Sequence, residues 1–365
     1  MRQFIFMGYL PHILMFMLPL AVSFSDIKNE DVNGVPRTDS IYNDAKLIFH
    51  ALNPKYNSPE LQGYDPPRAL EVMSLMLDGF VIQNPDLTTE MKTRVSNIQK
   101  SLSRAKINYL TCIQFVFTPD AVQEHELAQL FAENVKDLAA NPSDPSLLFT
   151  GGHYIVSKEG NLGGHTVIDD VVCQPNGKLQ FVINNSGTKA EKYHKTTEDR
   201  IDQLVYEDLE IDDLDEVFWR ELIRTNFNNP VSSDKLMDSF YASVDAKLLK
   251  ANNKTSGRPI KRQRAGVCAW KSLISWLHGA IAPGKFKKSR DPYDELVFLK
   301  FKKFMFENML ANFNPTPGFK ATIGKKPGTI SQNEDSFYVE DGAAADFLKI
   351  ELKRKIKKLD EKIKT

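Results

Sequence analysis

The chain has 365 residues, of which 42% are hydrophobic and 26% are charged, and its 47 basic side chains balance 47 acidic ones. This composition is typical of a globular protein and excludes a disordered chain, a collagen-like repeat and a membrane protein with many spans. The neutral balance indicates no nucleic-acid partner. Three cysteines (Cys112, Cys173 and Cys268) are too few for a disulfide scaffold, and Cys173, Cys268 and His165 lack a spacing typical of metal ligands. We therefore expect neither a metal nor another cofactor.

An apolar segment stands at the start of the chain. Residues 4–24 contain no Asp, Glu, Lys or Arg, follow Arg2 and precede polar sequence. A basic start, an apolar middle and small residues near the end are typical of a secretory signal peptide. The same segment is long enough to anchor the chain in a membrane if it is not removed, and a buried helix is the third alternative. We expect residues 1–25 to be a signal peptide or anchor, so that the protein is exported or contacts a membrane there.

The next section, residues 26–146, is predicted to be mainly helical. Four segments have apolar residues at helical spacing: 41–52, 69–80, 88–106 and 120–139. Asp86 is the candidate N-cap of the third of these helices, and Asp120 begins the fourth. The aromatic and β-branched segment 109–117 favours a strand or a buried segment instead.

From residue 147 the pattern changes to short strands. Three segments are predicted as strands: 147–149, 165–172 and 179–183. Asn176-Gly177 between the last two is a strong hairpin turn, because such residues tolerate positive φ. The two ends of a hairpin lie side by side, so His165 and the pair Asn184-Asn185 are predicted neighbours. Asp169 and Asp170 are consecutive in one strand, so at least one of them should face outwards.

Helices are predicted to return after this strand-rich section. The acidic segment 207–216 leads into a helix over 215–226, whereas the basic segment 250–264, rich in Gly, Ser and Asn, is predicted to be an exposed loop. A helix begins at Cys268, and another covers 293–312.

The highly charged segment 346–365 is predicted to form a single amphipathic helix. Its apolar residues recur at steps of three and four along a narrow seam: Leu352, Ile356, Leu359 and Ile363. The simplest expectation is a terminal helix packed on its own domain. A partner helix or an anionic membrane surface is the alternative occupant of the seam.

The segment that is richest in chemistry runs from Gln263 to Ser272 and joins a polar loop to an apolar helix. Cys268 stands at the junction, where unsatisfied N–H groups and the helix dipole stabilise a thiolate and lower its pKa. The amide of Gln263 is a candidate donor to an oxyanion beside this nucleophile. Trp270 fits the apolar face of the helix and is also a candidate substrate-binding side chain. Taken alone, a cysteine at the start of an apolar helix is weak evidence for catalysis, because buried, inert cysteines are common.

A histidine that follows two glycines supplies the candidate base. In Gly163-Gly164-His165 the glycines leave room for close approach, and the hairpin brings Asn184 or Asn185 beside the imidazole. An Asn carbonyl that accepts from one ring nitrogen leaves the other facing the thiol, which is the logic of a Cys-His-Asn triad.

Two further histidines are alternatives for roles at this site. His153 follows Gly151-Gly152 and is the second candidate base. His194 lies in a polar segment and is a candidate for substrate contact, or else a solvated loop histidine.

The order of these residues resembles the His-first branch of papain-like cysteine peptidases, which includes ubiquitin-like-protein proteases and deubiquitinase-like effectors of intracellular bacteria such as Legionella and Chlamydiales. Three blocks carry the resemblance: Thr150–Tyr154 with Gly163–His165, Phe181–Gly187 with Tyr193-His194, and Gln263–Ser272. It covers about residues 147–280. It implies that Cys268 is the nucleophile, His165 the base and Gln263 the oxyanion donor. It also favours Asn185 over Asn184 as the orienting residue.

The resemblance also implies a fold and a division of the chain. The expected class is α+β, with a papain-like core over residues 147–315 that contains an antiparallel sheet and a nucleophile helix. The helical region 26–146 precedes this core, and the C-terminal extension 316–365 follows it.

The expected function is that of a cysteine peptidase or isopeptidase that acts by thiol acyl transfer. Its substrate would be a protein, such as ubiquitin or a ubiquitin-like protein in a host cell to which the chain is delivered. Two alternatives remain open. One is an acyltransferase on the same scaffold, and the other is a catalytically inactive binding module that uses the helices of 69–139 and the basic tail.

Overall fold

The computed structural model describes residues 45–52, 66–114, 120–141, 146–156, 162–187, 189–197, 199–227, 233–262, 268–284, 289–313 and 343–364. Over these residues the chain combines helices with one antiparallel sheet, in agreement with the expected α+β class. The predicted signal segment, residues 1–25, and Gln263 lie outside the described residues.

The front of the chain is helical, as predicted. Its helices are α2 (Ala45–Leu52), α3 (Pro66–Gln83), α4 (Thr89–Cys112) and α6 (Ala121–Ala140). Asp120 caps α6 by accepting from the backbone N–H groups of Val122 and Gln123, so that prediction is confirmed. The predicted cap of α4 is wrong by two residues, because the side chain of Thr88, not Asp86, accepts from Met91 N.

The segment predicted as a strand or buried segment begins as the last turn of α4. Residues Tyr109–Cys112 are helical, and Tyr109 and Cys112 are buried. The strand prediction is therefore wrong for these four residues, while the alternative of burial is confirmed. Aromatic and β-branched side chains mark contact with the core, and tertiary packing decides the backbone period here. Residues 115–117 lie outside the described part of the chain.

Five strands form the sheet in the order in which they occur in the chain, and every neighbouring pair is antiparallel. The strands are β1 (Leu147–Val156), β2 (Leu162–Cys173), β3 (Leu179–Asn184), β4 (Arg200–Leu209) and β5 (Lys254–Lys261). The three predicted strands and the turn at Gly177, which has a φ of 80°, are confirmed.

Strands β4 and β5 were not predicted from the sequence, and β5 replaces the exposed loop expected at 250–264. It is an edge strand, so it needs ladder hydrogen bonds on one side only and tolerates Pro259. The ladder between β4 and β5 is irregular between Asp202 and Leu204. Because an edge strand tolerates proline and polar residues, β5 has a composition typical of a loop, which is why the sequence pattern indicated a loop there.

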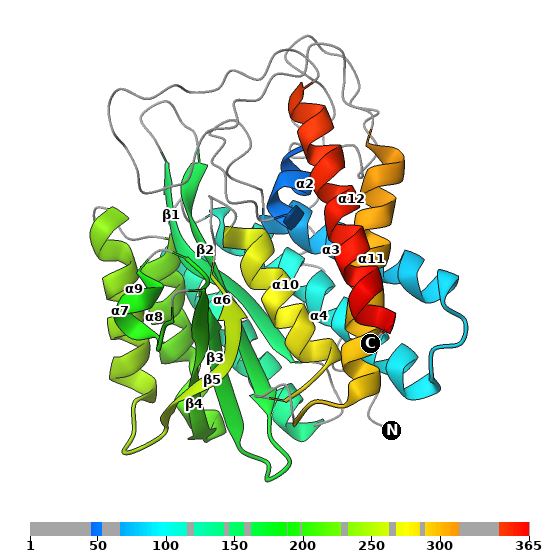
Figure 1. Ribbon diagram of the computed structural model, residues 1–365. Coiled ribbons are helices and arrows are strands. Elements are labelled where there is room, and N and C mark those ends of the chain that lie inside the picture. The colour runs from blue at the N-terminus through cyan, green and yellow to red at the C-terminus, as the bar shows by residue number, and fades with distance from the viewer. Residues whose placement is uncertain are drawn as a thin grey trace.

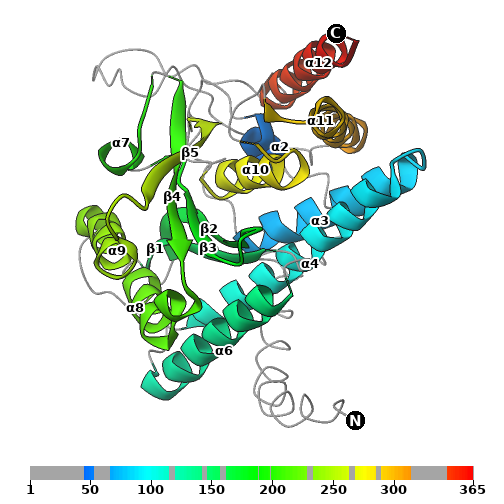
Figure 2. The same ribbon diagram turned by 90° about the horizontal axis from the view of Figure 1, so that it is seen from below.

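Helices cover both faces of the sheet (Figures 1 and 2). On one face lie α6, α8 (Glu216–Phe227) and α9 (Ser233–Leu248), around an aromatic core in which Trp219 stacks on Phe131 at 4.8 Å. On the other face lies α10 (Cys268–Ile281), with α3, α11 (Pro292–Asn312) and α12 (Ala343–Lys364) in the same hydrophobic cluster, while α4 contributes side chains to the clusters on both sides. The short helices α7 (Ala190–Tyr193) and η2 (Ile211–Leu214) flank β4 in the chain.

The two-sided cover explains why one expectation fails. Asp169 and Asp170 point to opposite faces of β2, yet both are buried. A strand with one solvated face would expose one of them, whereas this sheet has no solvated face at that point.

The helices at the two ends of the described chain share one core. Side chains of α2, α3 and α4 pack in the same hydrophobic cluster as those of α10, α11 and α12. Leu352 and Leu359 of α12 are buried there, which confirms the amphipathic helix and its packing on its own domain.

None of the helices that the structure describes is long and apolar enough to cross a membrane.

Candidate active site

Three elements meet at one end of the sheet and carry the predicted triad. His165 lies near the beginning of β2, Asn185 directly follows β3, and Cys268 is the first residue of α10. Gln263, the predicted oxyanion donor, lies outside the described residues.

The register of the hairpin selects Asn185 as the partner of His165. Ile168 of β2 pairs with Asn184 of β3, so Asn184 shares a face with even-numbered residues of β2 and Asn185 with odd-numbered ones. The Nε2 atom of His165 lies 2.9 Å from Oδ1 of Asn185, and both side chains are buried. Asn184, on the opposite face, accepts instead from Gln203 Nε2 at 2.6 Å.

The hydrogen bonds of Asn185 fix the tautomer of the histidine. The backbone N–H of Gly187 donates to Asn185 Oδ1 at 2.9 Å, so that atom is an acceptor. His165 Nε2 must therefore carry the proton in its bond to the same oxygen. The unprotonated Nδ1 of the neutral ring is then left for the thiol, with which His165 is hydrogen-bonded.

The sulfur of Cys268 lies where a thiolate is stabilised. The backbone N–H of Thr166 donates to Sγ at 3.4 Å, and the thiol is hydrogen-bonded to His165. Burial raises the pKa of the Cys268 thiol, but the hydrogen bond and charge of His165, with the N–H groups of Thr166 and Ala269, outweigh it and hold the pKa at about 7. Cys268 as a whole residue is partly exposed, in contrast to the fully buried Cys112.

The pKa of the His165 imidazole is shifted in the opposite direction, upwards. Burial of His165 lowers its pKa, but the hydrogen bond and charge of Cys268 and the hydrogen bond to Asn185 raise it above its ordinary value. A lowered thiol pKa beside a raised imidazole pKa favours a thiolate–imidazolium pair.

Two local contacts hold these groups in register. The hydroxyls of Ser186 and Ser272 lie 3.5 Å apart and join the end of β3 to α10 one turn after Cys268. Strand β1 also approaches β2 closely at Gly152, whose φ is 118°. A Cβ atom at Gly152 would lie 2.0 Å from the carbonyl oxygen of His165. Only glycine fits there, so β1 supports the backbone that carries the imidazole.

The remaining candidates lie away from a substrate-facing surface or outside the described side chains. His153 pairs with His165 across β1 and β2, and its side chain lies outside the described part of the structure. Trp270 is buried in the hydrophobic core between α10 and its neighbouring helices, as the apolar face of α10 requires. It therefore fits the structural alternative better than the substrate-binding one.

His194 is buried, so the expectation of a solvated loop histidine is not met. Its Nδ1 lies 2.7 Å from the carbonyl oxygen of Asp202, and its Nε2 lies 2.6 Å from the hydroxyl of Tyr241. Both ring nitrogens thus have protein partners, which leaves neither for a substrate. Tyr241 was not predicted as part of the site, because it lies on α9, a helix that no sequence pattern predicted.

The other thiols differ from Cys268. None of the three cysteines forms a disulfide. Cys112 is fully buried, and burial raises the pKa of its thiol. Cys173 is half-buried at the end of β2 and donates to the carbonyl oxygen of Gln174.

Among the described residues, no group of three or more His, Cys, Asp or Glu side chains could hold a metal ion.

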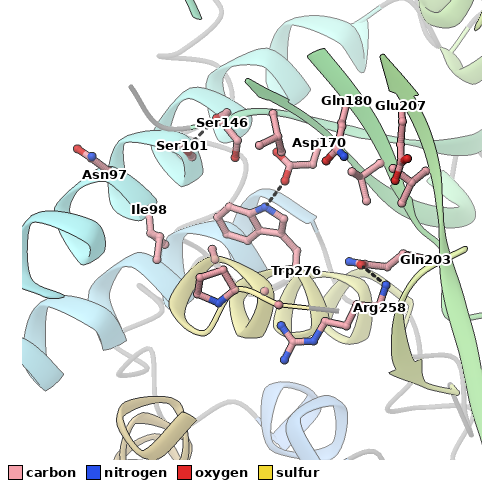
Figure 3. Close-up of a pocket in the computed structure, with 18 of the residues that line it drawn as sticks. Asn97, Ile98, Ser101, Ser146, Asp170, Gln180, Gln203, Glu207, Arg258 and Trp276 are labelled. Atoms are coloured by element: carbon pink, nitrogen blue, oxygen red, sulfur yellow. Dashed lines mark hydrogen bonds between the residues drawn. The ribbon is translucent and has the colours of Figure 1, made fainter. Parts of the chain in front are cut away.

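A separate pocket of about 490 Å³ lies between α4, α10 and the sheet (Figure 3). Asp170 and Trp276 line it and are joined by a hydrogen bond of 3.0 Å from the indole N–H to the carboxyl group. Burial raises the pKa of Asp170 to about 7, against the opposing hydrogen bonds from Ser146 and Trp276. None of the three triad residues lines this pocket.

The chain matches no protein-family model, and no curated protein is significantly similar to it in sequence.

Proposed function

We propose that the protein is a cysteine hydrolase that uses Cys268, His165 and Asn185 in a papain-like arrangement. The proposal rests on the chain of hydrogen bonds that joins Cys268 to His165 and His165 to Asn185. The thiol of a cysteine at the start of a helix is hydrogen-bonded to an imidazole, and an Asn carbonyl accepts from the far nitrogen of that imidazole. A thiol that only packs in a core needs none of these contacts, whereas a nucleophile needs all of them.

The proposed reaction is acyl transfer. The Cys268 thiolate attacks the carbonyl carbon of a peptide or isopeptide bond, and the carbonyl electrons move to the oxygen. The imidazolium of His165 then gives its proton to the leaving amine as the C–N bond breaks. Water, deprotonated by His165, attacks the resulting thioester, releases the acid and restores the thiol. We propose a protein substrate, such as ubiquitin or a ubiquitin-like protein.

The test uses the full chain and an electrophilic ubiquitin probe, ubiquitin with a C-terminal vinyl methyl ester, together with a peptide acyloxymethyl ketone. We expect at least one probe to modify Cys268 covalently at neutral pH. Cys268→Ala should abolish the labelling, and His165→Ala should reduce its rate by roughly a hundredfold or more.

Cys173→Ala is the matched control, because it removes another half-buried thiol and leaves the triad intact. Its labelling should equal that of the unmodified chain. An inert Cys268 toward both probes at neutral pH would overturn the proposal and favour a binding module. Labelling without hydrolysis of the matching amide, but with transfer of the acyl group to an added amine, would instead identify an acyltransferase.

A further inference from the structure

A line of hydrogen bonds continues beyond the triad into the protein. Asn185 Nδ2 donates to the hydroxyl of Tyr241 at 3.0 Å, and that hydroxyl lies 2.6 Å from Nε2 of His194. His194 Nδ1 lies 2.7 Å from the backbone carbonyl oxygen of Asp202 in β4. The line thus connects the end of β3 with α9, with the residue after α7 and with β4.

The direction of each hydrogen bond follows from the chemistry of the two ends. The carbonyl oxygen of Asp202 can only accept, so His194 Nδ1 carries a proton. Burial lowers the pKa of His194 to about 4, against the hydrogen bond to Asp202 and together with the charge of Lys254, so the ring is neutral at pH 7. Its Nε2 is therefore an acceptor, and Tyr241 donates its hydroxyl proton to it.

Tyr241 is consequently a donor to His194 and an acceptor from Asn185 at the same time. Asn185 in turn accepts from His165, as its bond from Gly187 requires. Every donor in the line points away from Cys268 and towards Asp202. Hydrogen bonds aligned in this way polarise one another. The electronegative acceptor atom of each group in the line lies on the side that faces the imidazole of His165.

We infer that Tyr241 and His194 are positioning residues that orient the Asn185 amide and stabilise the imidazolium form of His165. The inference rests on the proposed triad and goes beyond it, because neither residue reaches the reacting atoms. A neutral Asn stabilises an imidazolium less than an Asp does. The aligned dipoles behind Asn185 supply part of the missing negative potential.

Several ionisable groups surround this line of hydrogen bonds without being part of it. The ring of Tyr193 stacks on that of Tyr241 with centroids 4.0 Å apart, and its hydroxyl donates to Asp238 instead. The ionisable groups that act on Tyr241 and His194 are Asp169, Tyr193, Glu191 and Lys254.

The test measures the rate at which iodoacetamide alkylates Cys268 between pH 5 and pH 9, with the modified cysteine identified by mass spectrometry. This readout needs no substrate. Tyr241→Phe should move the profile to higher pH, so that the rate at pH 6 falls roughly three- to tenfold. Tyr193→Phe is the matched control; it removes the hydroxyl of the stacked ring outside the line and should leave the profile unchanged.

Two substitutions of His194 provide a rescue test that does not depend on Tyr241→Phe folding. The amide oxygen of Gln reaches the position of Nε2 and can accept from Tyr241, whereas the shorter Asn reaches only the position of Nδ1. His194→Gln should therefore keep most of the wild-type profile, and His194→Asn should resemble Tyr241→Phe.

The outcomes separate this inference from the proposed function. A folded Tyr241→Phe chain with the wild-type profile, or equal profiles for the two His194 variants, overturns the inference. If the profiles shift as expected but no acyl probe or substrate reacts, the hydrogen-bond line stands and the hydrolase proposal fails. If His165→Ala leaves the profile unchanged, both fail.

Discussion

Asn184 and Asn185 are consecutive in the chain, but their side chains bond to groups on opposite faces of the sheet. Asn185 holds His165, whereas Asn184 accepts from Gln203. The alternation of side chains along a strand assigns one asparagine to the imidazole and excludes the other. Two substitutions that look alike in the sequence therefore have different expected effects.

Asn185→Ala should reduce the reaction of Cys268 with an electrophilic probe at neutral pH by on the order of tenfold, because His165 loses the acceptor that fixes its ring and tautomer. Asn184→Ala should leave that rate within about twofold of the unmodified chain, since it removes only the acceptor of Gln203. The rates of probe labelling of the two variants show which asparagine orients His165. Equal losses in the two variants would show that the asparagines act through the stability of the hairpin alone.

Gly152→Ala should destabilise the protein by roughly 2–5 kcal/mol and slow the labelling of Cys268. The new Cβ would lie 2.0 Å from the carbonyl oxygen of His165, and the φ of 118° is unfavourable for alanine. Chemical denaturation gives the free energy of unfolding. Gly177→Ala is the control, because Gly177 also has a positive φ, of 80°, but nothing lies within 4 Å of its added Cβ. It should cost only about 1–2 kcal/mol and leave the labelling unchanged.

Asp170→Asn should make the free energy of unfolding of the protein less dependent on pH. Burial raises the pKa of Asp170 to about 7 in the folded chain, against opposing hydrogen bonds, while the unfolded value is near 3.8. The folded state then holds the proton more tightly, so its stability is highest below pH 4 and falls as pH rises to about 7. The loss amounts to at most about 4 kcal/mol.

The free energy of unfolding of the Asp170→Asn variant, relative to the unmodified chain, should therefore increase from pH 4 to pH 7. At pH 4 the two chains should differ little, because both side chains are neutral there. A constant difference across this range would contradict the raised pKa.

Trp270→Ala should lower the free energy of unfolding by about 3–5 kcal/mol, as expected for a large side chain removed from a packed core. Trp270→Phe, which keeps much of the apolar volume, should fold and should react with the peptide probe at nearly the wild-type concentration dependence. A large rise in the probe concentration needed for half-maximal rate in Trp270→Phe would restore Trp270 as a substrate-binding residue.

Short-range rules were sufficient to predict two parts of the candidate site. An Asn-Gly turn predicts the hairpin that brings His165 and Asn185 together, and an apolar helical period predicts that Cys268 begins a helix. The contact between the thiol and the imidazole could be inferred only from residue type and order.

Long-range packing explains the features that were not predicted. The burial of both Asp169 and Asp170 depends on helices that cover each face of the sheet, and one of these faces is covered by segments from both ends of the described chain. Tyr241 reaches Asn185 from α9, and no residue near it in the sequence indicates that role. Strand β5 is specified by its pairing with β4, not by its own polar composition.

The position of Cys268 late in the chain has a consequence for synthesis. Helix α10 completes its packing only with α11 and α12, which leave the ribosome after it. The segments that carry His165 and Asn185 are synthesised before α10, so a nascent chain that lacks α10 has the imidazole without its thiol partner. The lowered pKa of the thiol depends on its contacts with His165 and Thr166, so reactivity towards electrophiles at neutral pH arises only after α10 has docked on β2.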